Sequence, residues 1–282
     1  MFSVIVSKLY KYLMKKLLGK RLYRFRIIKL IHDYIVTLLP KENFEINGFK
    51  FNNNSGNLLL TEISNSEEIS FCNKQIQKNM NVIDIGANIG YYTVHLSNLV
   101  GPNGTVFAFE PDPLNFSILE KNIKLNDCKN VVLINKAVSN SCASTTLFQN
   151  SENSGGHSLI NSENIQKTIT VDTITLDDYF KNITISIDLV KIDVEGAEDF
   201  VINGGLNFFK IFKPKYVITE FELNSKIQDK SFYPDVLSHL NYDLLGKIDY
   251  SKSNSNIIQV SIDELKKSQI NSTVVNLIWK YT

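Results

Sequence analysis

Two carboxylates and two glycines within residues 81–110 have the types and spacing of a nucleotide-binding turn. An apolar run carries Asp84, Gly86 and Gly90 follow it, and a second apolar run ends at Glu110. The first run with its glycines predicts a strand, a tight turn and a helix. A carboxylate at the end of the neighbouring strand accepts hydrogen bonds from ribose hydroxyls. We therefore expect adenosine to bind at this turn.

The glycine spacing excludes a dinucleotide pyrophosphate as the ligand. A dinucleotide fingerprint has glycine at its first, third and sixth positions. Counted from Gly86, the third position is Asn88 and the sixth is Tyr91, and no Gly-Lys-Ser/Thr sequence provides a P-loop. Asp84 and Glu110 would repel a polyphosphate but suit a ligand with an ammonium, a sulfonium and a ribose, as in S-adenosylmethionine. The alternative is that Asp84 only caps a helix and Gly86 only turns the chain.

A second acidic stretch, residues 188–198, supplies the candidate catalytic groups. An apolar run leads into Asp193, Glu195 follows, and Gly196 turns the chain. If this strand lies beside strand 81–86, its acidic end emerges at the edge of the sheet where ligands of such folds bind. We expect Asp193 to be the general base for a hydroxyl acceptor, with Glu195 as the second candidate.

Other candidates and roles stay open for the acceptor side. His157 is the third candidate base, and Glu220 and Glu222 are reserve acceptor-site residues. Asp193 would alternatively only orient the cofactor or a backbone turn. Paired carboxylates are also ligands that suit Mg²⁺ or Ca²⁺, but no dedicated ligand loop is visible, so a divalent metal is possible and is not predicted.

The elements that must position these residues alternate between apolar runs and helical patterns. Such alternation predicts a mostly parallel sheet covered by helices on both faces. Within it, residues 139–187 are expected to form two short β segments at 144–149 and 168–172, a polar loop at 151–164, and a helix at 176–180. A polar loop in that place predicts substrate entry. The sheet strands are expected at 81–86, 105–110, 131–138, 188–194, 215–222, 242–248 and 273–281.

The charge distribution sets the first 41 residues apart from the rest. They contain ten of the thirty Lys and Arg and one of the twenty-nine acids, which leaves +9 there and −8 elsewhere. Their basic amphipathic pattern predicts a helical extension that either lies on an anionic membrane or caps the catalytic domain. We expect residues 42–78 to form a strand and helix flank or lid, and residues 79–282 to form the catalytic domain.

Composition narrows the compartment and the partners. Three dispersed cysteines predict neither a disulfide framework nor a zinc site. No apolar run approaches the ~20 residues of a spanning helix, and no signal-peptide pattern is evident, so we expect a cytoplasmic protein with possible peripheral contact at the inner membrane face. An acidic catalytic part disfavours nucleic acid as a partner.

Several stretches together resemble the FkbM-type S-adenosylmethionine-dependent methyltransferases. The resemblance implies the α/β class I methyltransferase fold, a seven-stranded mostly parallel sheet in the order 3-2-1-4-5-7-6, with 273–281 as the antiparallel seventh strand. It also implies O-methylation, commonly of a sugar hydroxyl in a glycan, a glycolipid or a glycosylated metabolite. The motifs that carry it are residues 83–93, 108–113, 121–126, 136–139, 155–159 and 191–198.

The same resemblance implies the site residues. Asp193, Glu195 and Glu198 match the acidic motif that faces the acceptor. A small-molecule or glycan acceptor is expected, while a lipid, peptide or nucleic-acid acceptor, or a non-catalytic cofactor-binding module, remains an alternative. The residues expected to contact the cofactor are Asp84, Gly86, Asn88, Gly90, Tyr92, Thr93, Glu110, Ala137, Ser139 and Asp193.

Overall fold

The computed structural model describes residues 44–52, 66–150, 157–160, 165–222, 233–248, 257–267 and 274–282. The expected basic extension, residues 1–41, lies outside the described residues, as does most of the loop expected at 151–164.

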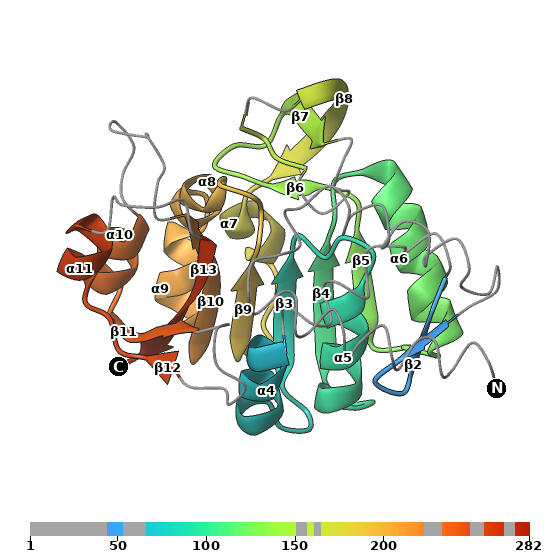
Figure 1. The fold of residues 1–282 in the computed structure, drawn as a ribbon, viewed down its shortest axis with the longest axis horizontal. Coiled ribbons are helices and arrows are strands. Elements are labelled where there is room, and N and C mark those ends of the chain that lie inside the picture. Colours follow the sequence, from blue (N-terminus) through green and yellow to red (C-terminus); the bar gives the residue numbers. More distant parts are fainter. Residues whose placement is uncertain are drawn as a thin grey trace, which may run out of the picture.

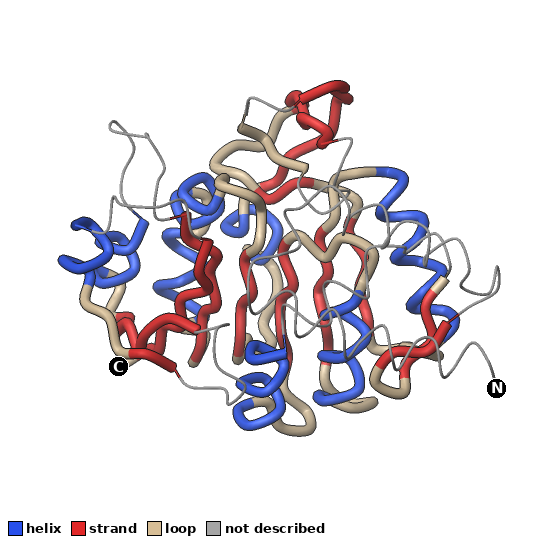
Figure 2. The backbone as a smooth tube through the Cα atoms, viewed as in Figure 1, coloured by secondary structure: helices blue, strands red, loops and turns tan. Residues whose placement is uncertain are grey.

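An eight-stranded sheet forms the centre of the molecule (Figures 1 and 2). Its strand order is β12-β11-β13-β10-β9-β3-β4-β5. Seven of these strands follow the order expected from the resemblance, and β12 adds an eighth at the edge by pairing with β11, so the expectation of seven strands is wrong by one. The bounds are β3 Asn81–Ile85, β4 Thr105–Phe109, β5 Val131–Ile134, β9 Leu189–Ile192, β10 Tyr216–Glu222, β11 Tyr242–Ile248, β12 Ile257–Ile258 and β13 Val274–Tyr281.

Strand direction follows the expected pattern. Strands β3, β4, β5, β9 and β10 pair in parallel, whereas β13 runs antiparallel to both β10 and β11. The expectation of an antiparallel strand at 273–281 is therefore confirmed. The central strands are near-continuous apolar runs because helices bury both of their faces.

Alternate residues of each central strand belong to two separate apolar layers. Val82 of β3 belongs to the apolar cluster that includes buried residues of α4, α5 and α6, whereas its neighbour Ile83 belongs to the cluster that includes residues of α7, α8, α9 and α10. These layers lie on opposite faces of the sheet, because successive strand side chains point in opposite directions. The helices are α4 Ser66–Gln75, α5 Tyr91–Val100, α6 Pro113–Leu125, α7 Leu176–Phe180, α8 Glu198–Asn203, α9 Leu206–Phe212, α10 Tyr233–His239 and α11 Ile262–Lys267.

A small second sheet projects beyond the carboxyl ends of the central strands (Figure 1). It contains β6 Ala137–Val138, β8 Ile165–Ile174 and β7 Ser144–Asn150, in that order. The β segments expected at 144–149 and 168–172 are thus confirmed as the antiparallel pair β7–β8, and the helix expected at 176–180 is α7.

The run 131–138, expected to be one strand, is divided between the two sheets. Strand β5 ends at Ile134 and pairs with β4, whereas β6 pairs with β8. At the break, the side-chain amide of Asn135 donates to the carbonyl oxygen of Glu110 over 2.7 Å. The prediction of a single strand is therefore wrong.

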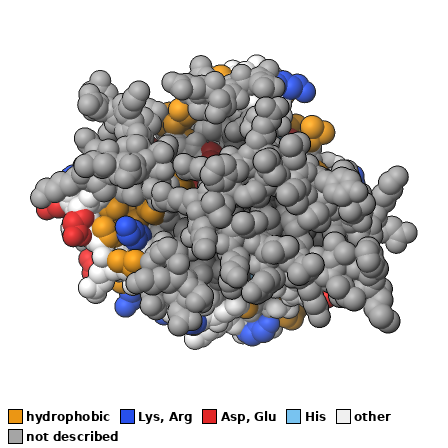
Figure 3. All heavy atoms as spheres, viewed as in Figure 1, with side chains coloured by type: hydrophobic (Ala, Val, Ile, Leu, Met, Phe, Trp, Pro, Cys, Tyr) orange, Lys and Arg blue, Asp and Glu red, His pale blue; other side chains and the backbone are white. Residues whose placement is uncertain are grey.

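The amino-terminal flank adds a hairpin and a helix. Strands β1 Phe44–Ile46 and β2 Phe49–Phe51 form an antiparallel hairpin beside α6, where Asn52 N donates to Asn122 Oδ1 over 2.7 Å. Among the helices that the structure describes, none combines the length and the apolar character needed to cross a membrane. On the face drawn in Figure 3, the described side chains that reach the surface include basic, acidic and apolar ones.

Candidate active site

The turn between β3 and α5 has glycine where the neighbouring chain leaves no room. Gly86 has a φ of +83°, and a Cβ placed on it would lie 1.8 Å from the carbonyl oxygen of Asp193. Gly90 has a φ of +91°, and its Cβ would lie 2.5 Å from Leu119 Cδ1. Gly86 therefore sets how closely β9 approaches the turn, because the atom it faces belongs to the backbone, whereas Gly90 is required for its positive φ.

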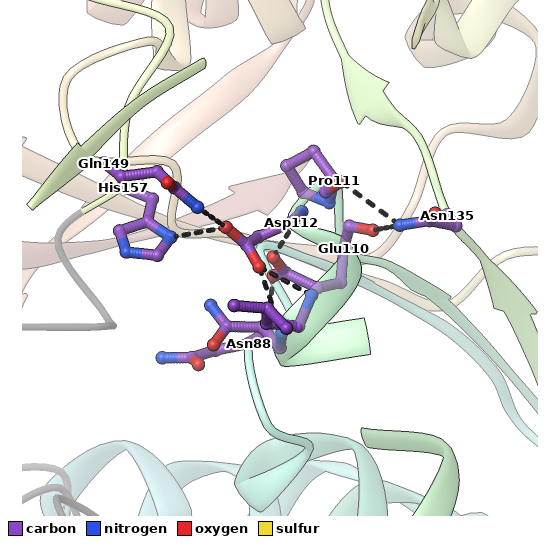
Figure 4. Close-up of polar contacts among 9 residues, drawn as sticks. Asn88, Glu110, Pro111, Asp112, Asn135, Gln149 and His157 are labelled. Carbon is purple, nitrogen blue, oxygen red and sulfur yellow. Dashed lines mark hydrogen bonds and ion pairs between the residues drawn. The ribbon is translucent and has the colours of Figure 1, made fainter. Parts of the chain in front are cut away.

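Glu110 follows β4 directly and accepts two backbone hydrogen bonds, one from the β3–α5 turn and one from the segment that leads into α6. Oε2 accepts a hydrogen bond from Asn88 N over 2.8 Å, and Oε1 accepts one from Asp112 N over 2.9 Å (Figure 4). Burial raises the pKa of Glu110 to about 7, although the two backbone donors oppose that effect. A carboxylate oxygen accepts more than one hydrogen bond, so the group retains capacity for ribose hydroxyls.

Asn88 gives an independent sign that a hydrogen-bonding ligand fits beside Glu110. Its backbone has a φ of +50°, and its buried side-chain oxygen has no hydrogen-bond partner among the described residues. Buried acceptors in proteins are nearly always satisfied. A hydroxyl-bearing group at this turn would satisfy it, and the residues present therefore fit the cofactor that the motif implies.

Asp84 and Thr93 lie together beneath the turn. Thr93 Oγ1 donates to Asp84 Oδ2 over 2.7 Å, and both residues are fully buried. Burial raises the pKa of Asp84, while Lys191 lowers it. The bond to Thr93 holds α5 to β3. The other carboxylate oxygen of Asp84, Oδ1, has no hydrogen-bond partner among the described residues.

Tyr92 contacts the residues around Lys191, and its expected contact with the cofactor stays a prediction. Its hydroxyl donates to Glu68, which also accepts from the amide of Asn276, and the ammonium of Lys191 lies 4.4 Å from the centre of its ring. Both Tyr92 and Glu68 are buried. The described contacts of Tyr92 are thus those of a support beneath β9.

The acidic stretch after β9 brings three carboxylates together. Asp193 N donates to Ile85 O over 3.0 Å, which confirms that this strand end lies beside β3. One carboxylate oxygen each of Asp193, Glu195 and Glu220 lies within 4.8 Å of the others. Burial, with the charges of Asp193 and Glu195, raises the pKa of Glu220 well above its usual range. Together these three carboxyl groups can accept several hydrogen bonds from hydroxyl groups within a small volume.

Glu198 closes the turn that presents these carboxylates. Its Oε1 accepts from Val194 N over 3.2 Å and from Gly196 N over 3.4 Å, and burial raises its pKa to about 7. Glu195 has a φ of +54°, in the left-handed region, as part of the same turn. These contacts of Glu198 are with the backbone, and its expected place facing the acceptor stays a prediction.

His157 lies on the cofactor side of the site. Its Nδ1 is 3.2 Å from Asp112 Oδ2, which also accepts from Gln149, while Asp112 Oδ1 caps α6 by accepting from Leu114 N and Asn115 N (Figure 4). Burial alone would raise the pKa of Asp112, but the bonds from His157, Gln149 and the helix lower it to about 2.

The residue after His157 reaches the acceptor side. Ser158 Oγ donates to the carbonyl oxygen of Glu195 over 2.7 Å, and Ser158 pairs with Phe148 of β7 through backbone hydrogen bonds. The polar loop therefore contacts Asp112 through one residue and the acidic turn through the next.

Ala137 and Ser139 stand apart from the hydrogen bonds of Glu110. Ala137 packs against Leu147 and Val171 in the small sheet, and Ser139 N donates to Ile174 O over 2.9 Å. Their expected role at the adenine edge stays a prediction.

Sequence reasoning missed two groups of this site. Lys191 is a lysine inside a fully buried apolar strand, which is the signal that would have singled it out. Asp112 stands in an Asp-Pro pair directly before a helix, a typical N-cap position, and its partner Gln149 comes from a distant strand that sequence spacing does not reveal.

Comparison with known proteins identifies the family. The Methyltransferase FkbM domain matches residues 84–247. Methyltransferase 1 of Beauveria bassiana (strain ARSEF 2860) is 27% identical over 143 residues, which cover 44% of this chain and 57% of that protein. Methyltransferase sdnD of Sordaria araneosa is 27% identical over 154 residues, which cover 44% and 59%. The chain thus matches somewhat more than half the length of these curated relatives.

Two methyltransferases are among the solved structures that this chain matches. A SAM dependent methyltransferase from Aquifex aeolicus is 13% identical, with 77% of this chain and 89% of that chain covered and a TM-score of 0.42. Precorrin-6y C5,15-methyltransferase from Geobacter metallireducens GS-15 is 14% identical, with 77% and 88% covered and a TM-score of 0.42. Because the family domain matches more than half of the sequence, the chain belongs to the FkbM family of S-adenosylmethionine-dependent methyltransferases.

Proposed function

We propose that the chain methylates a sugar hydroxyl of a glycan, a glycolipid or a glycosylated metabolite. The observation that carries the proposal is the group of carboxylates at Asp193, Glu195 and Glu220, whose oxygens lie within 4.8 Å of one another. Neighbouring hydroxyls of a sugar ring are donors that such a group accepts. O-methylation, the usual chemistry of the family, also requires a hydroxyl group as the methyl acceptor.

The cofactor side of the proposal uses the β3 turn and the end of β4. Glu110 and the side-chain oxygen of Asn88 would accept hydrogen bonds from ribose hydroxyls, because both are buried acceptors at this turn. When bound, S-adenosylmethionine supplies a methyl group on a positively charged sulfur, and that sulfur keeps the electron pair of the broken bond.

Asp193 is the proposed proton acceptor. A sugar hydroxyl is a weak nucleophile at neutral pH, and a positioned base contributes typically ~10²–10⁴-fold to the rate. As the hydroxyl oxygen forms its bond to carbon, its proton passes to the Asp193 carboxylate and then to solvent. Alignment of the reactants contributes on the order of 7–11 kcal/mol, so the carboxylate group also acts by holding the acceptor in place.

The test is methyl transfer by the purified chain. S-adenosylmethionine and a panel of glycans, glycolipids and glycosylated metabolites are incubated with it, and products are sought by the mass increase of one CH₂ unit. Asp193→Asn is expected to keep cofactor binding and to lose about 100-fold or more in turnover. Lipid, peptide and RNA acceptors complete the panel, and methylation of one of these with no sugar product would refute the sugar acceptor.

A chelator arm separates a proton-accepting role from a metal-binding one. Asp193, Glu195 and Glu220 have the oxygen donors that Mg²⁺ or Ca²⁺ would use. We expect turnover to persist in EDTA. Activity that is lost in EDTA and restored by Mg²⁺ would instead make these carboxylates metal ligands and would remove the base assignment of Asp193.

A further inference from the structure

Lys191 is a buried cation inside the central sheet. All four residues of β9 are buried, and Lys191 keeps only 3% of its surface exposed. Burying an ammonium group is costly unless it is paired and hydrogen-bonded. Lys191 therefore needs hydrogen-bond acceptors or negative charges inside the protein, because water does not solvate its ammonium group there.

The partners of Lys191 surround it with negative charge. Its Nζ donates to Asp193 Oδ2 over 2.8 Å, and Asp84 lies opposite it in register on β3. Its ammonium also lies 4.4 Å from the ring centre of Tyr92, whose hydroxyl is bonded to Glu68. Burial alone would lower the pKa of Lys191, but Asp193, Asp84 and Glu68 outweigh burial and raise it.

The pair is asymmetric in its exposure. The side chain of Lys191 is 4% exposed, whereas that of Asp193 is 31% exposed. Lys191 thus approaches Asp193 from the protein interior and occupies Oδ2, while the carboxylate as a whole reaches solvent. A carboxylate with one oxygen held from below presents its other oxygen to a group that arrives from outside.

We propose that Lys191 is a positioning residue for methyl transfer, which fixes the Asp193 carboxylate by its Oδ2 and leaves Oδ1 for the acceptor hydroxyl. This inference rests on the proposed function. The Tyr92 ring and the Glu68 carboxylate act one step further back, because they hold the ammonium beneath Asp193. Lys191 itself touches neither acceptor nor reacting atoms in this assignment.

The test is a double-mutant cycle on the full chain. Lys191→Met keeps the length of the side chain and removes its charge, and it is combined with Asp193→Asn. Lys215→Met is the matched control, since Lys215 is an exposed lysine 5.2 Å from the ring centre of Tyr216 on the next strand. The readouts are kcat, KM for the acceptor and the dissociation constant of S-adenosylmethionine.

Lys191→Met is expected to lose about 100-fold in kcat and to keep cofactor affinity within about threefold, because a misplaced base chiefly lowers the chemical step. In the Asp193→Asn background the same replacement is expected to have little further effect, and Lys215→Met is expected to match the wild type. Losses that multiply in the double variant would refute positioning through Asp193. An equal loss of cofactor binding and of kcat would likewise refute it.

Two further measurements keep the inference testable. If Lys191→Met does not fold, Lys191→Arg keeps a charged donor toward Asp193, and it is expected to retain kcat within about tenfold. A loss of about 100-fold in Lys191→Arg, with the Asp193 carboxylate unmoved in its crystal structure, refutes the proposal. A crystal structure of Lys191→Met is expected to show Asp193 displaced, and an unmoved carboxylate refutes the proposal without any assay. A wild type that methylates no sugar, or an Asp193→Asn variant with normal turnover, refutes the proposed function rather than the Lys191 contact.

Discussion

His157 Nδ1 lies 3.2 Å from the Oδ2 atom of Asp112, a buried carboxylate two residues beyond Glu110. The same carboxylate caps α6 and accepts from Gln149 of β7. One side chain therefore connects the end of β4, the start of α6 and the polar loop. This relationship gives the loop a structural anchor beside the cofactor turn.

The anchor predicts a specific loss of stability in acid. The folded-state pKa of Asp112 is lowered to about 2, so its contribution to stability is present above the unfolded pKa of 3.8 and disappears as the pH falls through 2. The difference corresponds to about 2 kcal/mol. Urea unfolding of the wild type is expected to lose this contribution between about pH 4 and pH 2.

Asp112→Asn is the variant that isolates this effect, because asparagine remains a good N-cap. It is expected to be less stable than the wild type at pH 6 and to lack the Asp112 part of the acid-dependent loss. An equally steep acid dependence in Asp112→Asn would mean that other carboxylates account for it.

The contact also predicts that His157 is not the catalytic base. His157→Gln keeps a side-chain donor toward Asp112, and it is expected to retain kcat within about threefold, because the Nδ1 of His157 is directed at the Asp112 carboxylate. The measurement is turnover with saturating cofactor, with Asp193→Asn as the comparison. A loss of about 100-fold in His157→Gln with intact cofactor binding would give His157 a proton-transfer role.

Most of the central sheet was predictable from sequence, because its strands are apolar runs bounded by turns and because the family implies their order. The antiparallel strand β13 and the neighbours β3 and β9 appeared where expected. The division of 131–138 was not predictable, because the partners of β5 and β6 and the bond from Asn135 to the carbonyl of Glu110, 25 residues back in the chain, are contacts between distant segments. The extra strand β12 is only two residues long and leaves no periodic signal.

The site was predictable where one motif carries it and hidden where distant segments meet. Glu110 binds Asn88, which belongs to the same turn that the glycines revealed. Asp112 accepts a hydrogen bond from Gln149 of another strand, and the ammonium of Lys191 lies over the ring of Tyr92 on a helix. Neither contact follows from the spacing of these residues along the chain. Side chains that stabilise a motif from a different element become visible only once the fold is known.

Glu110 predicts a pH dependence of cofactor binding. Its pKa is about 7 in the cofactor-free chain, and ribose hydroxyls donate stronger hydrogen bonds to the ionised carboxylate than to the protonated one. Binding therefore favours loss of the proton, so affinity is expected to be constant well above pH 7 and to weaken below it, up to about tenfold per pH unit. Isothermal titration of S-adenosylmethionine across pH 5.5–8.5, in buffers of different ionisation enthalpy, measures both the affinity and the released proton.

Two variants assign that dependence to one carboxyl. Glu110→Gln is expected to bind more weakly and to lose the step near pH 7. Glu198→Gln is the matched control, because the pKa of Glu198 is also about 7 and its bonds are to the backbone of the acidic turn. Loss of the step in Glu198→Gln, with its retention in Glu110→Gln, would contradict the assignment of Glu110 as the ribose acceptor.

Gly86 and Gly48 allow steric contact to be separated from backbone strain. They have nearly the same φ, +83° and +84°, but a Cβ on Gly86 would lie 1.8 Å from Asp193 O, whereas a Cβ on Gly48 meets no atom within 4 Å. Gly48→Ala is expected to cost about 1–2 kcal/mol of unfolding free energy from the left-handed conformation alone. Gly86→Ala is expected to cost more than about 4 kcal/mol, because β9 must move away from β3. Urea unfolding measures the free energy of unfolding of both variants. Equal losses would show that the carbonyl of Asp193 moves aside at no cost in stability, and Gly86 would then not set the spacing between β3 and β9.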